Sequence, residues 1–179
     1  MRALLGTLVF TILAPGAVTA LLPWLLLNSG LALSHQIGTA RFIGALPLAL
    51  GAVFYVWTAG DFVVSGHGTP APVDPPRILV SRGLYRLVRN PMYVGVCLAL
   101  AGECILFGSP VLLGYSLLVW LLFHLFVVYY EEPHLRKQFG TPYEEYCRLV
   151  PRWVPRWKRT SRRSAYPSKT TKTCGPAAR

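Results

Sequence analysis

The stretch that decides the fold runs from Val111 to Tyr130 and reads VLLGYSLLVWLLFHLFVVYY. It contains no charged residue. It is as long as the roughly 20 helical residues that a bilayer core about 30 Å thick requires. The stretch therefore predicts a transmembrane helix.

Three further apolar stretches precede it, at Ala3 to Leu27, Phe42 to Gly60 and Pro91 to about Phe107. The third and fourth stretches are separated by Gly108-Ser109-Pro110, a combination that breaks helices. The sequence thus predicts an all-α integral membrane protein with about four transmembrane helices, the third and fourth forming a tight hairpin. Val18-Thr19-Ala20 could be a signal-peptide cleavage site. Because the apolar run continues to Leu27, we expect a retained first helix.

The composition agrees with a membrane protein. Hydrophobic residues make up 53% of the chain and charged residues 14%, whereas about 25% are charged in soluble domains. The formal net charge is +11. In a chain this apolar, such a charge favours anionic lipid headgroups over nucleic acid as the partner. The sequence does not indicate an oligomeric state.

The basic residues set the orientation. Arg77, Arg82, Arg86 and Arg89 lie between the second and third spans, and most of the others lie in the C-terminal part beyond Arg136. With four spans these two regions share one side, which the positive-inside rule makes cytoplasmic. Both termini are then cytoplasmic. We divide the chain into two N-terminal helices (1–63), a core of linker, hairpin and C-terminal segment (64–159), and a disordered basic tail (160–179).

Two polar pairs should meet at the cytoplasmic end of the hairpin. Asn90-Pro91 begins the third span with a residue pair typical of a capped helix start, and plain capping is the simpler interpretation. Glu131-Glu132 ends the fourth span, where two carboxylates oppose the helix dipole. Arg136, Lys137 or a cationic ligand could offset their charge. A helix N-terminus beside a carboxylate would suit a zwitterionic cofactor.

Other polar or small residues lie inside the predicted spans. Gly95, Ala99 and Gly102 recur at helical spacing and predict close packing against another helix. Glu103 lies about 18 Å along the helix from Pro91, with Trp120 as an expected hydrogen-bond donor. No pattern of His and Cys indicates a metal site.

Two sequence blocks carry a family resemblance. They read RILVSRGLYRLVRNPMYVG (77–95) and EEPHLRKQFGTPYEEYCRLVPRWVP (131–155). In order and separation they resemble the R-(H/N)-P-x-Y-x-G and E-E-x-x-L…F-G-x-x-Y-x-x-Y…V-P-R pattern of the isoprenylcysteine carboxyl methyltransferase family, within the membrane methyltransferases that include phospholipid methyltransferases. The resemblance spans roughly Gly68 to Pro155.

The resemblance implies S-adenosylmethionine as the cofactor, held at the cytoplasmic face. It implies cofactor contacts at Arg77, Ile78, Leu79, Val80, Tyr85, Asn90, Pro91, Met92, Tyr93 and Glu131. Arg89, Glu103 and Glu132 are the expected substrate contacts. The sequence departs from the family in two places. Asn90 stands where the family has His, and Val127 stands where the prenylcysteine enzymes have an Arg for the substrate carboxylate.

The expected reaction is methyl transfer to a membrane-embedded small molecule or lipid that offers a carboxylate, an amine or a similar nucleophile. The Val127 position leaves the acceptor open. Two alternatives remain: a membrane reductase of the sterol-reductase type that uses NADPH, and a lipid-binding membrane protein without enzymatic activity.

Overall fold

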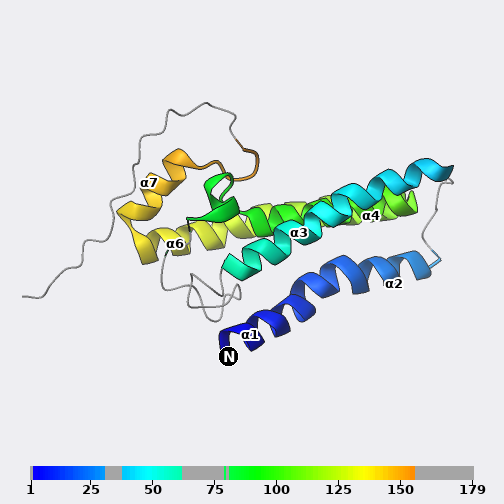
Figure 1. Ribbon diagram of the computed structural model, residues 1–179, viewed down its shortest axis with the longest axis horizontal. Helices are drawn as coiled ribbons and strands as arrows, with labels where there is room; N and C mark the ends of the chain where they lie inside the picture. Colours follow the sequence, from blue (N-terminus) through cyan, green and yellow to red (C-terminus); the bar gives the residue numbers. More distant parts are fainter. Residues whose placement is uncertain (1, 31–37, 62–78, 80, 156–179) are drawn as a thin grey trace, which may run out of the picture.

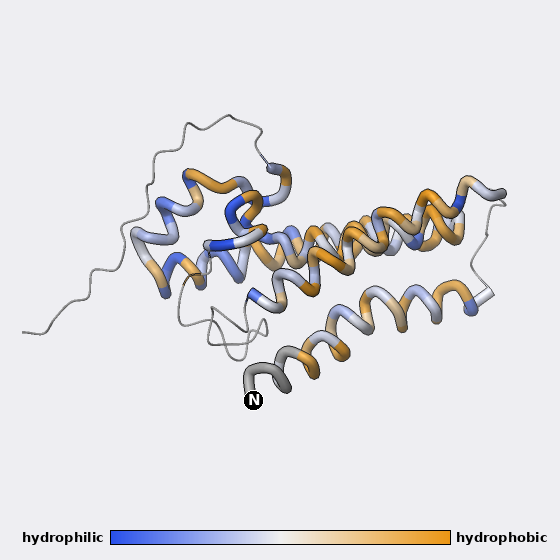
Figure 2. The backbone as a smooth tube through the Cα atoms, viewed as in Figure 1, coloured by the Kyte–Doolittle hydropathy of each residue, from blue (hydrophilic) through white to orange (hydrophobic). Residues whose placement is uncertain are grey.

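A computed structural model describes residues 2–30, 38–61, 79 and 81–155, and every regular element in these ranges is a helix. Three helical stretches are long and apolar enough to cross a membrane: Leu8–Asn28, Gly38–Asp61 and Pro110–Phe139. The long rods are largely hydrophobic, whereas the end that carries α6 and α7 is more hydrophilic (Figures 1 and 2). An all-helical membrane protein is therefore confirmed.

The first rod joins α1 (Arg2–Thr11), a π-helical segment η1 (Ile12–Leu21) and α2 (Leu22–Asn28). Pro15 lies inside the π-helical segment, where the wider turn accommodates a residue that cannot donate a backbone hydrogen bond. Two hydrogen bonds attach the rod to the other helices. Thr11 Oγ1 lies 2.9 Å from the Tyr55 hydroxyl, and the Tyr115 hydroxyl donates to the Val18 carbonyl at 2.8 Å.

A seam of small residues joins α3 (Ala45–Asp61), which follows the 3-10 turn η2 (Gly38–Gly44), to α4 (Pro91–Phe107). A Cβ atom added to Gly95 would lie 2.9 Å from the Gly51 carbonyl oxygen, and one added to Gly102 would lie 2.6 Å from that of Gly44. The two backbones approach this closely only because these positions lack side chains. The predicted close packing at Gly95 and Gly102 is confirmed, and α3 and α4 run side by side (Figure 1).

A short connection links α4 to α5 (Pro110–Phe126). Gly108 ends α4 with φ 56°, and the Ser109 hydroxyl accepts a hydrogen bond from the Leu112 amide at 3.4 Å. Cys104 Sγ lies 3.1 Å from Ser116 Oγ across the two helices. At 17 residues, α4 is only about 25 Å long and is shorter than the three continuous helical stretches Leu8–Asn28, Gly38–Asp61 and Pro110–Phe139. Four crossings and a hairpin within the bilayer stay predictions.

The chain beyond α5 continues without interruption through a π-helical segment η5 (Val127–Glu131) into α6 (Glu132–Phe139). In the sequence, Leu135, Phe139, Tyr143 and Tyr146 give the stretch from Glu131 to about Arg148 a helical pattern. The stretch is helical, but Gly140 at φ 58° ends α6 and the chain turns into α7 (Thr141–Leu149). The turn lets Tyr143, Tyr146 and Val150 form a second small core, packed against Leu135 and Phe139 of α6.

Candidate functional site

The start of α4 is the first part of the site. Pro91 occupies the first helical turn, and Asn90 precedes it as a buried residue. The Asn90 side chain does not cap the helix, however, because its Nδ2 donates to the Arg152 carbonyl at 3.3 Å. The expectation of plain side-chain capping is therefore wrong. The first-turn amides of α4 remain without a side-chain acceptor, which leaves the positive end of the helix dipole uncompensated.

Glu131 lies beside this helix start, at the end of η5. The Tyr93 hydroxyl donates to Glu131 Oε2 at 2.9 Å and holds the carboxylate in place. The Tyr93 ring packs against Phe123, with ring centroids 4.7 Å apart. In the part of the chain that the structure describes, no basic side chain forms an ion pair with Glu131. Its negative charge is therefore available to a cationic ligand.

Tyr85 joins the site from the 3-10 turn η4 (Gly83–Arg86). Its side chain is buried, and its carbonyl accepts a 2.7 Å hydrogen bond from the Tyr146 hydroxyl of α7. Burial, followed by the negative charge of Glu131, holds the pKa of Tyr85 well above its ordinary value. Tyr85 therefore stays a neutral phenol next to the carboxylate.

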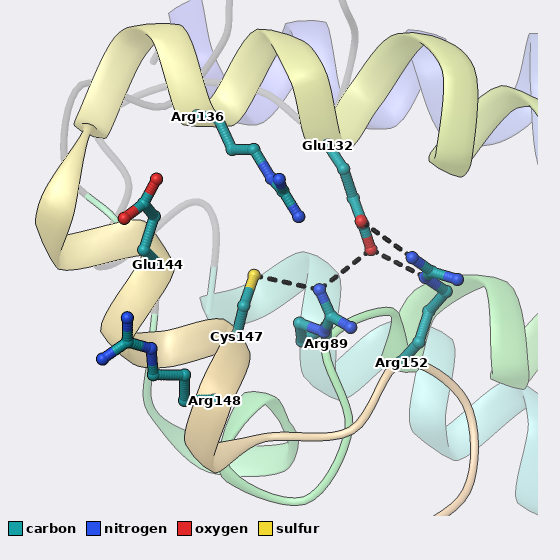
Figure 3. A pocket seen from close by; sticks show the side chains of 7 residues that line it. All are labelled: Arg89, Glu132, Arg136, Glu144, Cys147, Arg148 and Arg152. Atoms are coloured by element: carbon teal, nitrogen blue, oxygen red, sulfur yellow. Dashed lines mark hydrogen bonds and ion pairs between the residues drawn. The ribbon is translucent and has the colours of Figure 1, made fainter.

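Glu132 faces a different set of partners from Glu131. Arg89 Nη1 lies 2.9 Å from Glu132 Oε1, while Arg152 contacts both carboxylate oxygens, through Nε at 2.7 Å and Nη2 at 2.9 Å (Figure 3). The hydrogen bond to Glu132 raises the pKa of Arg152. Arg89 also donates to Cys147 Sγ at 2.9 Å. We expected Arg136 or Lys137 as nearby countercharges, but the ion-pair partners come from far along the chain.

The C-terminal segment closes over the start of α4. The Arg89 amide donates to the Pro151 carbonyl at 2.8 Å. Trp153 Nε1 donates to His124 Nδ1 of α5 at 3.2 Å. These contacts fix the loop before α4, the end of α5 and the C-terminal segment as one unit. Our site prediction omitted Arg152 and Trp153, although the V-P-R motif at residues 150–152 was a usable signal for the first.

The structure brings together Tyr85, Asn90, Pro91, Tyr93 and Glu131 from the predicted cofactor set. Met92 instead packs against the hydrophobic core that contains Tyr55 and Leu100. Leu79 packs against the small core of α7. The predicted contacts Arg77, Ile78 and Val80 lie outside the described residues.

Glu103 lies apart from this cluster, about 18 Å along α4 from Pro91. It is buried, and its Oε2 has no hydrogen-bond partner among the described residues. The expected donor, Trp120, stacks on His124 instead, with ring centroids 5.6 Å apart. The predicted Trp120–Glu103 hydrogen bond is therefore wrong: Trp120 packs against a ring of its own helix.

Val127, the position at which the resemblance leads us to expect an arginine, has 0% of its surface exposed. Its side chain is apolar and offers no charge to a ligand.

Comparisons with known proteins identify the family of the chain. The sequence profile of the family described as phospholipid methyltransferase matches residues 39–142, more than half of the chain. A probable protein-S-isoprenylcysteine O-methyltransferase of Oryza sativa subsp. indica is 35% identical over 118 residues, 64% of this chain and 60% of the relative. The enzyme of that name from Schizosaccharomyces pombe is 38% identical over 90 residues, 50% of this chain and 38% of the relative. Protein-S-isoprenylcysteine O-methyltransferase B of Arabidopsis thaliana is 33% identical over 78 residues, 43% of this chain and 39% of the relative.

The matches thus span between 38% and 60% of the length of these relatives. No solved structure matches the chain. The relatives confirm the resemblance predicted from the two motif blocks. The profile match covers α3, α4 and α5, and it includes both Tyr93 and Glu131. The chain therefore belongs to the phospholipid methyltransferase family.

Proposed function

We propose that the chain transfers a methyl group from S-adenosylmethionine to a small molecule or lipid embedded in the membrane. The observation that carries the proposal is the half-buried Glu131 carboxylate, which Tyr93 holds beside the start of α4, where the Asn90 side chain does not cap the helix. Similarity to methyltransferases over the region that builds this cluster supports it.

The chemistry of the donor set fits the cofactor. When bound, S-adenosylmethionine supplies a methyl group on a positively charged sulfonium, together with an amino acid part that carries both charges. Glu131 offers a negative charge to the cationic part of such a ligand. The first-turn amides of α4 offer hydrogen bonds to a carboxylate. We assign the cofactor contacts to Leu79, Tyr85, Asn90, Pro91, Met92, Tyr93 and Glu131, and to Arg77, Ile78 and Val80 of the same linker.

The protein's own contribution is alignment and exclusion of water, since direct displacement at a sulfonium needs little further activation. Tyr93 fixes the Glu131 carboxylate, and the buried, neutral Tyr85 closes the neighbouring side. The contacts of Pro151 and Trp153 keep the C-terminal segment over the start of α4. A carboxylate acceptor needs no general base, whereas a lipid amine must first lose a proton.

We further propose four membrane crossings, with α4 as the third, and with the site and both termini on the cytoplasmic side. The arginines of the linker and the basic C-terminal part support this orientation. The acceptor would then reach the site sideways from the bilayer.

The acceptor remains a class rather than a compound. The relatives are named as prenylcysteine O-methyltransferases, but Val127 removes the cation that would hold a prenylcysteine carboxylate. Arg89, Glu103 and Glu132 are our predicted substrate contacts. Arg89 and Glu132 already share an ion pair, so an acceptor headgroup would have to rearrange that pair or approach its outer side.

The test is methyl transfer by the purified protein in nanodiscs. The protein receives methyl-labelled S-adenosylmethionine and, in separate samples, a farnesylcysteine analogue, phosphatidylethanolamine or a total lipid extract. We expect one labelled lipophilic product, strongly reduced in the Glu131→Gln variant and kept in Glu145→Gln, an exposed carboxylate on α7. Tight NADPH binding without any response to S-adenosylhomocysteine would favour a reductase. Absence of a labelled product from all acceptors would favour a lipid-binding role.

A further inference from the structure

A polar cavity lies beside the cofactor cluster, between α6 and α7. Its volume is about 330 Å³. Glu132 and Arg136 reach it from α6, and Glu144, Cys147 and Arg148 reach it from α7 (Figure 3). Neither Glu131 nor Tyr93 lines it. The cavity is therefore separate from the site proposed for the cofactor.

The charges in this cavity do not balance. Four arginines line it (Arg89, Arg136, Arg148 and Arg152) against two glutamates, Glu132 and Glu144. Glu132 is shared by Arg89 and Arg152. Among the described residues, Arg136 and Arg148 form no ion pair, and Arg89 Nε is buried without a hydrogen-bond partner. The cavity thus carries two positive charges in excess and donors that await an acceptor.

The proposed topology also assigns the cavity a depth relative to the membrane. The apolar helix Pro110–Phe139 has 30 residues and is about 45 Å long, whereas the hydrocarbon core is about 30 Å thick. Its last turns therefore extend into the headgroup layer. Tyr129 and Tyr130 are 77% and 54% exposed, as expected for an aromatic belt at the interface. In the proposed topology, Glu132 and Arg136 then lie at the level of the lipid phosphates.

We propose that this cavity binds the phosphate group of an anionic phospholipid. Guanidinium groups match phosphate oxygens in planar, bidentate geometry. The excess of two positive charges favours a lipid with net negative charge over a zwitterionic one, whose ammonium group the arginines would repel. The depth of the cavity favours a membrane lipid over dissolved phosphate. Because Arg89 and Glu132 are also proposed acceptor contacts, the inference rests in part on the proposed function, but the binding itself requires neither methyl donor nor acceptor.

The experiment measures lipid binding by the full chain in detergent micelles, without methyl donor. The probes are fluorescent phosphatidylglycerol and fluorescent phosphatidylcholine, followed by anisotropy. We expect clear preference for phosphatidylglycerol. Each arginine near a lipid surface contributes about a fivefold change in affinity, so the double variant R136Q/R148Q should bind phosphatidylglycerol roughly 25-fold more weakly.

Matched controls separate the cavity from general charge. The double variant R86Q/K137Q removes two exposed positive charges that do not line the cavity, and it should lose much less affinity. Glu144→Gln removes a negative charge from the rim and should strengthen binding about fivefold. Thermal melting shows whether the double arginine variant folds. If it does not, the gain in affinity for phosphatidylglycerol expected of Glu144→Gln still tests the proposal.

Two outcomes overturn the proposal. Equal loss of binding in R136Q/R148Q and R86Q/K137Q would mean that phosphatidylglycerol responds to net charge alone. Inorganic phosphate and a soluble glycerophosphate diester are each titrated against the bound fluorescent lipid. If phosphate displaces the lipid at the same concentration as the diester or at a lower one, the ligand is dissolved phosphate. Persistent preference for phosphatidylglycerol in the presence of excess phosphate supports the lipid.

Discussion

Glu131 is the residue on which the proposed cofactor site depends, because its carboxylate is held by Tyr93 and no described cation pairs with it. Glu131→Gln keeps the size of the side chain and removes its charge. Loss of a charge-assisted contact of about 2 kcal/mol corresponds to roughly 30-fold weaker binding. We expect this loss for the sulfonium cofactor and a smaller one for the neutral thioether S-adenosylhomocysteine, both measured by titration calorimetry.

The comparison of two ligands distinguishes a direct contact from a structural effect. Equal losses for the cofactor and for its thioether product would contradict a role of Glu131 against the sulfonium. Tyr93→Phe removes only the hydroxyl that positions the carboxylate. Its affinity for the sulfonium cofactor should lie between those of the wild type and of Glu131→Gln.

Glu132 has a structural role that can be measured separately. The Glu132 side chain is 6% exposed and that of its partner Arg89 is 13% exposed. Glu132→Gln leaves two arginines without their anion, and breaking a buried pair in this way costs roughly 3 kcal/mol. We expect a clear decrease in melting temperature in detergent. Arg82→Gln is the control, because Arg82 is 60% exposed and lies 3.9 Å from Asp61, a geometry that contributes little. A similar melting temperature in both variants would refute the role of the buried cluster.

At the residue scale the sequence predicted the right polar groups but not all of their partners. Asn90 was identified because Asn-Pro is typical of a helix start, and Glu131 and Glu132 because carboxylates at a helix C-terminus need a countercharge. Their partners could not be read locally. Arg136 and Lys137 are neighbours in sequence, whereas Arg152 reaches Glu132 only because Gly140 turns α7 back toward α4.

At the scale of elements, the seam between α3 and α4 is the feature that tolerates the least change. A Cβ added to Gly102 would lie 2.6 Å from the Gly44 carbonyl and equally close to the Leu48 amide. Such overpacking costs about 1–3 kcal/mol. We therefore expect Gly102→Ala to lower the melting temperature. Gly114→Ala on α5 is the matched control, since its Cβ would meet nothing within 4 Å and alanine favours a helix by up to about 1 kcal/mol. Equal effects of the two substitutions would contradict a tight seam.

The elements themselves were largely predictable, since uncharged stretches of spanning length have few alternatives in a chain of this composition. The expected break at Gly108-Ser109-Pro110 is confirmed, with α4 ending at Phe107 and α5 beginning at Pro110. The turn at Gly140 was missed because the apolar spacing from Leu135 to Tyr146 continues across it. Periodicity reports which side chains are apolar, not whether one glycine adopts a left-handed φ.

At the scale of the whole molecule, the proposed topology makes a prediction about the two sides of the membrane. In a background without the native cysteines, single cysteines replace Ser29, Pro110 or Thr141, all of which are exposed. We expect a membrane-impermeant maleimide to label the first two from outside intact cells. Thr141→Cys should react only after permeabilisation. Protection of Pro110→Cys in intact cells would mean that α4 does not cross the membrane.

The arrangement of the whole site could be predicted only in part from the sequence. An antiparallel pair of helices joined by a short connection brings Asn90 toward Glu131, and this proximity could be argued from topology alone. The closure by Pro151, Arg152 and Trp153 could not, because it depends on long-range hydrogen bonds whose partners have no fixed spacing.

The late position of Arg152 and Trp153 in the chain has a consequence for biosynthesis. Both residues follow every helix in the described part of the chain, yet they complete the contacts around Glu132 and His124. A ribosome that has just finished α6 has synthesised Glu132 and its partner Arg89, but not Arg152 or Trp153. The long apolar helices are therefore synthesised before the residues that complete the site.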